Sequence, residues 1–195
     1  MKGVVATREI DPSYRLPVRG LFPLPPITAS VFGQELLPAM VIPNIGGWVG
    51  GLLTRTEVEG AFSWYERLKK PSWRPPNWAF GPVWTTLYCG MGAASWMVWR
   101  QGGGLNGVAK VPLLLYGSSL ALNWAWSPVF FKLHQTGWGL GIISALWLNV
   151  AACIGAFYPI NKVASYLMVP YLAWLSLATA LNFCIWRDNP KADKM

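Results

Sequence analysis

The chain has 195 residues, of which 53% are hydrophobic and only 12% charged, and its mean hydropathy is positive. These proportions place it among membrane proteins rather than ordinary soluble domains. Sixteen Lys and Arg residues against eight Asp and Glu give a net charge of +8. The basic residues fall between and outside the apolar segments, which favours contact with lipid headgroups over binding of nucleic acid.

The first 34 residues differ from the rest of the chain. They contain scattered prolines and arginines and no apolar run of the length that a secretory signal peptide requires. Glu9, Asp11 and the prolines interrupt the amphipathic helix that a mitochondrial transit peptide would form. We therefore expect residues 1–34 to be a disordered extension that precedes a membrane domain at residues 35–188.

Five uncharged apolar runs follow, each long enough to cross a bilayer. A hydrocarbon core about 30 Å thick requires roughly 20 helical residues, because each residue advances a helix by about 1.5 Å. The runs cover residues 36–53, 78–99, 111–131, 137–158 and 163–186. Lipid cannot satisfy free backbone groups, so such runs form helices rather than open strands. The sequence therefore predicts an all-α integral membrane protein, a bundle of five transmembrane helices, with a polar C-terminal tail at residues 189–195.

Closely spaced small residues occur in the first two runs, and a proline-rich connection joins these runs. Clusters of glycine, such as Gly46 and Gly47 or Gly90 and Gly92, allow the backbones of neighbouring helices to approach closely. The connection, residues 54–77, combines aromatic and basic residues with three prolines that hold the preceding residues extended. We expect it to form a stiff cap at the membrane interface over one end of the bundle.

The chain has thirteen tryptophans, and eleven of them fall into two groups. Those near the ends of the runs suit the headgroup boundary: Trp64, Trp73, Trp78, Trp99 and Trp186. Six lie deeper, at Trp84, Trp96, Trp124, Trp126, Trp147 and Trp174. Helical spacing pairs Trp84 with Tyr88, Asn123 with Trp126, and Trp174 with Ala178 and Asn182 on shared helix faces. Aromatic residues deep in a helix bundle often do no more than pack in its hydrophobic core. This set, however, also has the composition of a pocket for a flat hydrophobic ligand.

Among the polar residues within the runs, three asparagines most need an explanation: Asn123, Asn149 and Asn182. An unpaired amide in hydrocarbon costs several kcal/mol, so each requires a partner. Hydrogen bonds between helices would supply one, and so would a carbonyl or carboxylate group of a ligand. Both interpretations stay open at this point.

Several blocks of the sequence together carry a more specific signal. They are Trp64-Tyr65, LKKPSWRPPNW at residues 68–78, GPVWTTLY at 81–88, ALNWAW at 121–126 with Phe130-Phe131, PYLAWL at 170–175, and WRDN at 186–189. These blocks resemble the translocator protein family, also known as the peripheral benzodiazepine receptor or tryptophan-rich sensory protein family. The likeness covers about residues 36–189 and leaves out the N-terminal extension.

The resemblance implies a five-helix bundle, often a homodimer, in the mitochondrial outer membrane of a eukaryote or the outer or plasma membrane of a bacterium. It implies binding of porphyrins such as protoporphyrin IX or haem, of cholesterol and of benzodiazepine-type drugs, with a role in their transport, sensing or turnover and no required cofactor. Matching positions place the pocket at Gly51, Trp84, Tyr88, Asn123, Trp126, Trp138, Trp174, Ala178 and Leu181. We expect a porphyrin face to stack on the indoles, with Asn123 or the Trp84 N–H as donor.

The family's sterol motif, Leu-x-Tyr-xxx-Arg, corresponds here to Leu181, Phe183 and Arg187. Phe183 stands where the motif has tyrosine, so a sterol hydroxyl loses one possible partner. Such motifs are weak patterns even when they are intact. The sequence therefore supports porphyrin binding more strongly than sterol binding.

Three other functions remain as alternatives. Light-dependent porphyrin degradation is associated with some bacterial relatives, although the runs contain no paired carboxylates, Ser-His-Asp set or Cys-His pair for ordinary catalysis, so no catalytic residue is assigned. Ion-coupled transport requires ionisable residues within the runs, which have none, so only uncoupled sterol transport stays open. Docking of a partner protein is the third. Isolated cysteines and a single histidine predict neither a disulfide framework nor a metal site.

Overall fold

The structure, a computed structural model, describes residues 24–58 and 63–192, and every regular element in these residues is helical. The first stretch runs without a break through α1 (Ala29–Val31), the π-helical η1 (Phe32–Leu36) and α2 (Leu37–Val58). It is followed by α3 (Trp64–Arg67), α4 (Asn77–Gln101), η2 (Gly104–Asn106), α5 (Lys110–Ser127), η3 (Pro128–Lys132), α6 (Thr136–Phe157) and α7 (Lys162–Asp188).

Each predicted apolar run coincides with one long helical stretch, and the third run covers α5 and η3 together, which confirms that the runs are helical. The first helical stretch begins earlier than expected, at Ala29, where the Thr28 side chain accepts a hydrogen bond from the backbone N–H of Val31 at 3.2 Å. Residues 29–34, expected to belong to a disordered extension, are therefore helical. Residues 1–23 of that extension and residues 193–195 of the tail lie outside the described residues.

By length and composition, three helices of the described chain are able to cross a membrane: Ala29–Val58, Thr136–Phe157 and Lys162–Asp188. The helices α4 and α5 have 25 and 18 residues. Neither of them combines sufficient length with as high a mean hydropathy as the other three. The expectation of five membrane spans therefore stays a prediction at this stage.

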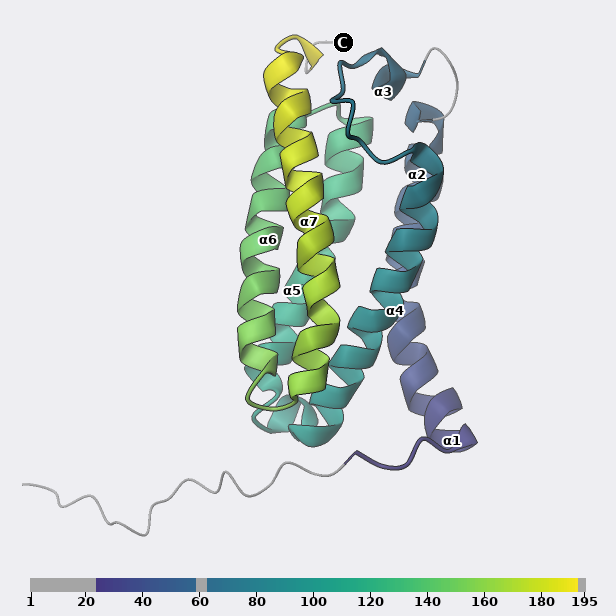
Figure 1. The fold of residues 1–195 in the computed structure, drawn as a ribbon. Helices are drawn as coiled ribbons and strands as arrows, with labels where there is room; N and C mark the ends of the chain where they lie inside the picture. Colours follow the sequence, from purple (N-terminus) through teal and green to yellow (C-terminus); the bar gives the residue numbers. More distant parts are fainter. Residues whose placement is uncertain (1–23, 59–62, 193–195) are drawn as a thin grey trace, which may run out of the picture.

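The long helices lie side by side and alternate in direction (Figure 1). α6 packs between α5 and α7, while α4 packs against both α7 and α2. α2 also contacts α5 and η3. The start of the first helical stretch lies at one end of the bundle, and α3 lies with the C-terminal end of α7 at the other (Figure 1).

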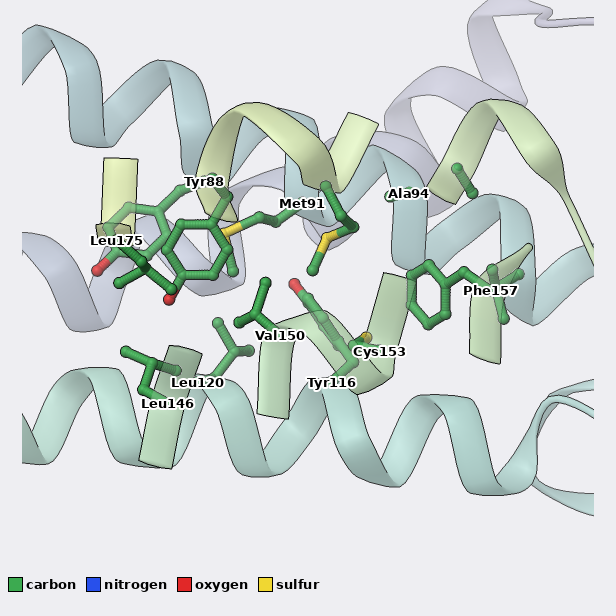
Figure 2. Packing of buried hydrophobic residues seen from close by; sticks show 14 of the residues in the cluster. Tyr88, Met91, Ala94, Tyr116, Leu120, Leu146, Val150, Cys153, Phe157 and Leu175 are labelled. Atoms are coloured by element: carbon green, nitrogen blue, oxygen red, sulfur yellow. The ribbon is translucent and has the colours of Figure 1, made fainter. Parts of the chain in front are cut away.

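A stripe of buried residues on α6 shows how the sequence builds the core. Ile143, Leu146, Val150, Cys153 and Phe157 follow one another at alternating intervals of three and four, and all are almost completely buried. This spacing keeps one face of a helix turned toward its neighbours. In Figure 2 the side chains of Leu146, Val150, Cys153 and Phe157 meet those of the neighbouring helices in one continuous core.

Glycines bring α2 close to its neighbours, as the sequence predicted. A Cβ atom added to Gly92 of α4 would collide with the backbone of α2 at Ala39. A Cβ atom added to Gly46 of α2 would collide with the indole of Trp124 on α5. Close backbone approach of this kind requires the smallest side chain.

At the end of the bundle opposite α3, the carboxylate of Glu35 joins the first helical stretch to α4. Glu35 accepts a hydrogen bond of 3.0 Å from Nε1 of Trp96 and lies 3.4 Å from Nη1 of Arg100. Trp96, expected among the deep aromatics, is buried here and joins α4 to the start of the first helical stretch. This contact explains why that stretch is ordered upstream of its expected start.

Candidate ligand-binding site

A cavity of about 760 Å³ lies between α2, α4, α5 and α7 and extends to η3 and α3. Eight of the nine predicted pocket residues line it: Gly51, Trp84, Tyr88, Asn123, Trp126, Trp174, Ala178 and Leu181. They come from four different helices, and the fold gathers them around one space. The positions that helical spacing grouped in pairs on separate helices therefore face the same cavity.

Trp138 is the exception. It is 70% exposed and is not among the residues that line the cavity. The buried residues of the first turns of α6 are Thr136, Gly139 and Ile143, and a helix turns by about 100° per residue, so Trp138 points away from them. The structure thus places Trp138 on the outside of the bundle, contrary to the expected pocket.

Aromatic rings form much of the cavity wall. Trp84 and Tyr88 stack with ring centroids 5.3 Å apart, and Trp126 stacks on Phe130 at 4.9 Å. Phe80 meets Trp174 edge-to-face at 5.6 Å. Paired rings hold one another in a fixed orientation and leave flat faces and edges toward the cavity. Such a wall suits a planar, mostly hydrophobic molecule.

The predicted asparagines make hydrogen bonds within the protein. Asn123 Nδ2 donates to the hydroxyl of Tyr88 at 2.5 Å. Asn182 accepts from Nε1 of Trp126 at 3.1 Å and donates to the backbone carbonyl of Thr136 at 2.9 Å. Asn149 donates to Ser118 at 2.7 Å on the outer side of α6. The interpretation as hydrogen bonds between helices therefore holds for all three, and Asn123 and Asn182 line the cavity as well.

Sequence reasoning did not assign several residues that line the cavity. Trp124 was expected to lie deep but was given no place in the pocket, and Phe80, Tyr65, Asn44 and Arg55 were not assigned to it at all. Phe80 and Tyr65 were hidden because they lie at the ends of their segments, where an aromatic also suits the membrane interface. A pattern of apolar residues cannot show which way such a ring turns.

The segment of residues 63–76, here called the lid, closes one end of the cavity. Trp64 is 2% exposed, stacks on His134 with ring centroids 4.3 Å apart and meets Phe130 at 5.7 Å. Tyr65 packs against Phe131 and lines the cavity. The lid therefore covers the bundle with aromatic contacts, as the proline-rich sequence predicted.

Polar contacts join the lid to the end of α7 and link its residues to one another. The backbone N–H of Lys69 donates to Oδ1 of Asn189 at 2.8 Å, and Nδ2 of Asn189 donates back to the Lys69 carbonyl at 2.9 Å. Glu66 lies 3.6 Å from Nζ of Lys70 and 3.9 Å from Nη1 of Arg74. These contacts fasten the lid to the end of α7 and make it rigid internally.

The lid's charged groups influence one another's ionisation. A hydrogen bond from Asn77 lowers the pKa of the Glu66 carboxyl, and the positive charges of Lys70 and Arg74 lower it further. Burial lowers the pKa of the Lys70 ammonium, against the opposing effect of the Glu66 carboxylate. Burial raises the pKa of the Tyr65 phenol. At neutral pH the Glu66 carboxylate is therefore charged and holds its two cationic neighbours.

The three residues of the sterol motif do not share a surface. Leu181 is buried and lines the cavity, whereas Phe183 is 43% exposed and the Arg187 side chain 59% exposed. The Arg187 guanidinium lies over the Phe183 ring, 5.8 Å from its centroid. Phe183 and Arg187 are four residues apart and so share the outer face of α7, while Leu181 and Ile185 face inward.

The described residues offer no cluster of three His, Cys, Asp or Glu side chains that could hold a metal ion. Cys89, Cys153 and Cys184 are all free thiols. The groups that line the cavity are thus aromatic faces, a few amides and hydroxyls, and the Arg55 side chain. Such groups can bind and orient a ligand.

Comparison with known proteins agrees with this architecture. The sequence model of the TspO/MBR family matches residues 39–187. The translocator protein of Homo sapiens is 46% identical over 156 residues, which cover 78% of this chain and 90% of that protein. Protein CrtK of Rhodobacter capsulatus is 40% identical over 131 residues, covering 66% of this chain and 79% of that protein.

A third relative extends the comparison to a protein named for its tryptophans. The tryptophan-rich sensory protein of Cereibacter sphaeroides is 40% identical over 126 residues, which cover 65% of this chain and 77% of that protein. The matched regions contain the long helices and the lid, so the likeness includes every element that surrounds the cavity. The chain is an integral membrane protein and belongs to the TspO/MBR family.

Proposed function

We propose that this chain binds flat hydrophobic ligands, in particular porphyrins, in the cavity between α2, α4, α5 and α7. The aromatic cavity of about 760 Å³ carries this proposal. Pockets for small ligands measure about 300–1,000 Å³ and are mostly apolar, with a few polar groups that fix orientation. The cavity has both properties, and its walls are paired rings.

The proposal includes five membrane spans. α4 packs against α2 and α7, and α5 packs against α6 and α2. These three neighbours are long and apolar enough to cross a membrane, and α4 and α5 run along them in the bundle (Figure 1). Large apolar side chains are exposed on the outside of the bundle, including Leu114 of α5 and Leu148 of α6. A helix packed along membrane helices over its whole length shares their surroundings.

A sterol is the second ligand class that we propose, with a different location. Because Phe183 and Arg187 lie on the outer face of α7, a sterol that binds to this motif would lie against the outside of the bundle. The names of the relatives, translocator and sensory protein, support a role in moving or detecting the ligand. Neither role requires catalytic groups.

The test is a titration of the detergent-solubilised protein with protoporphyrin IX, followed by quenching of tryptophan fluorescence. Trp84→Phe removes an indole from the cavity wall, and Asn123→Ala removes the partner of Tyr88. Trp138→Phe is the matched control, since it removes an indole that lies outside the cavity. We expect Trp84→Phe and Asn123→Ala to weaken binding by about threefold to tenfold, the effect of losing one ring contact or hydrogen bond.

The control separates two locations for the ligand. Saturable quenching that is weakened by Trp84→Phe and unchanged by Trp138→Phe would support the cavity. Quenching that does not saturate, or that weakens only with Trp138→Phe, would contradict the proposal.

A further inference from the structure

His134 lies where the lid meets the helices of the bundle. It belongs to the connection between η3 and α6, outside the apolar runs, and it is the single histidine of the chain. Its ring stacks on Trp64 of the lid, with ring centroids 4.3 Å apart and planes inclined by 9°. Trp64 is almost completely buried, whereas 24% of the His134 side chain is exposed. A ring that exchanges protons with water therefore contacts the buried indole of the lid.

The backbone of His134 has an uncommon conformation. Its φ of 56° lies in the left-handed region, and it is the one positive φ among the described residues other than glycine. A residue with a Cβ atom adopts this region at an energetic cost, although histidine and asparagine do so more often than most. The turn thus directs a titratable ring between the lid and α2, where neighbouring contacts offset this cost.

Two charged side chains of the described chain form a cluster with His134. Oε2 of Glu57, on α2, lies 3.3 Å from Nε2 of His134. Lys132, on η3, places its Nζ 3.6 Å from the other carboxylate oxygen of Glu57 and donates to the hydroxyl of Thr56 at 3.2 Å. Lys132 therefore holds the carboxylate in place beside the ring. That carboxylate attracts a protonated ring, whereas it can only accept a hydrogen bond from a neutral one.

The lid and α6 meet the ring with uncharged groups. The lid presents the indole of Trp64, while Glu66 in the same short helix is paired with Lys70 and Arg74. The first turn of α6, which begins at Thr136, has no ionisable side chain. Histidine is the side chain that ordinarily changes its charge between about pH 5 and 8. In that range, His134 is therefore the member of this cluster that changes charge.

We propose that the charge of His134 controls closure of the lid, because the protonated ring holds Trp64 more firmly than the neutral ring does. A cation over the face of an indole is attracted by the negative charge of that face. The Glu57 carboxylate stabilises the imidazolium that the indole partly removes from water. Since the closed lid binds the protonated ring more strongly, closure increases as the pH falls and decreases as it rises. This inference concerns access to the cavity and does not depend on which ligand binds there.

The experiment measures opening of the lid by the reaction of a cysteine with a maleimide. Leu68 of the lid is 5% exposed and packs in the same core cluster as Trp64, so Leu68→Cys reacts when the lid opens. Ser72→Cys lies at an exposed position of the lid and reacts at all times. Each is the single cysteine of a full-length chain whose own three cysteines are replaced. The ratio of the two rates at one pH removes the pH dependence of the thiol itself.

With His134 in place, we expect the ratio of the Leu68→Cys rate to the Ser72→Cys rate to be about twofold to fivefold lower at about pH 6 than at about pH 8. This is the difference that one cation–π contact makes. His134→Phe keeps a ring and has no charge, so its ratio should be the same at both pH values. A ratio that does not change with pH when His134 is present, or that is lower at the higher pH, would overturn the inference.

A second variant covers the case in which phenylalanine does not fit the left-handed backbone. His134→Asn suits that conformation and lacks both the ring and the charge. Its ratio should exceed that of the histidine protein at about pH 6 and should not change with pH. A pH dependence that persists in both His134→Phe and His134→Asn would show that another group controls the lid.

Glu57→Gln and Lys132→Gln form a matched pair, because each removes one charge from the same ion pair and only Glu57 contacts the ring. We expect Glu57→Gln to reduce the change in the ratio with pH, since the imidazolium loses its carboxylate partner, and Lys132→Gln to retain most of it. An equal reduction in the two variants, or no reduction in Glu57→Gln, would overturn the role of the contact between His134 and Glu57.

Discussion

Asn182 joins three helices through the two ends of one amide. It lies on α7, is 1% exposed, accepts from the indole of Trp126 on the α5 side and donates to the Thr136 carbonyl at the start of α6. In a bundle without water, such a group fixes the rotation and depth of each helix it touches. The same contact sets the plane of the Trp126 ring beside the cavity.

We expect Asn182→Ala to destabilise the protein by about 1–3 kcal/mol, because it removes a buried acceptor and donor together. Asn149→Ala is the comparison: it removes one bond, to Ser118, on the outer side of α6, where about 0.6 kcal/mol is typical. The measurement is the thermal unfolding midpoint of each purified variant in the same detergent. Similar losses in the two variants would contradict the role assigned to Asn182.

Individual residues also show which side-chain directions could be predicted from the sequence and which could not. The spacing of Trp84 and Tyr88, or of Trp174 and Ala178, was sufficient to find shared faces, because residues four apart on a helix always point the same way. The direction of a face depends on neighbouring helices, which no local pattern contains. Trp138 and Phe183 were assigned to a pocket and a motif by the family resemblance, and the structure places both on the outside of the bundle.

Among the contacts between elements, the close packing of α2 against α4 requires a residue without a side chain. At Gly92 the backbone of α2 occupies the space that a Cβ atom would need, with Ala39 as the nearest residue. Two residues away, a Cβ atom on Gly90 would lie 3.7 Å from the Leu167 carbonyl of α7, which is an ordinary contact. The same helix thus offers one glycine that is required and one that is replaceable.

We expect Gly92→Ala to destabilise the protein by about 1–3 kcal/mol, because α2 must move away from α4 to admit the methyl group. Gly90→Ala should be neutral or slightly stabilising, since alanine favours a helix over glycine by up to about 1 kcal/mol. Thermal unfolding and protoporphyrin affinity are measured on both variants. A loss of stability in Gly90→Ala as large as in Gly92→Ala would show that the close approach of α2 is not the cause.

The elements themselves were largely predictable. Lipid solvent forces apolar runs into helices, so their ends fall within a few residues of the charged and proline-rich boundaries in the sequence. The lid was recognisable from its prolines and interfacial aromatics. The early start of the first helical stretch was not, because it depends on the contact of Glu35 with Trp96, 61 positions away in the sequence.

For the molecule as a whole, the number of membrane crossings decides how the cavity relates to lipid. If α4 and α5 cross with α2, α6 and α7, the cavity lies inside a five-span bundle, and the lid and the η2 connection lie on opposite sides of the membrane. If only the three most apolar helices crossed, the lid and the η2 connection would lie on the same side. The C-terminus shares the side of the lid in both arrangements.

Single cysteines at exposed positions distinguish these arrangements in a chain whose own three cysteines are replaced. We expect Ser72→Cys of the lid and Lys191→Cys near the C-terminus to react with a membrane-impermeant maleimide from one side of oriented vesicles, and Asn106→Cys of the η2 connection from the other. Lys191→Cys controls for orientation, and protoporphyrin binding confirms that each protein is folded. Labelling of Asn106→Cys from the same side as Ser72→Cys would contradict five spans. Two of the helices that bound the cavity, α4 and α5, would then lie outside the hydrocarbon core, where water would satisfy the amide of Asn123 and weaken the reason for its contact with Tyr88.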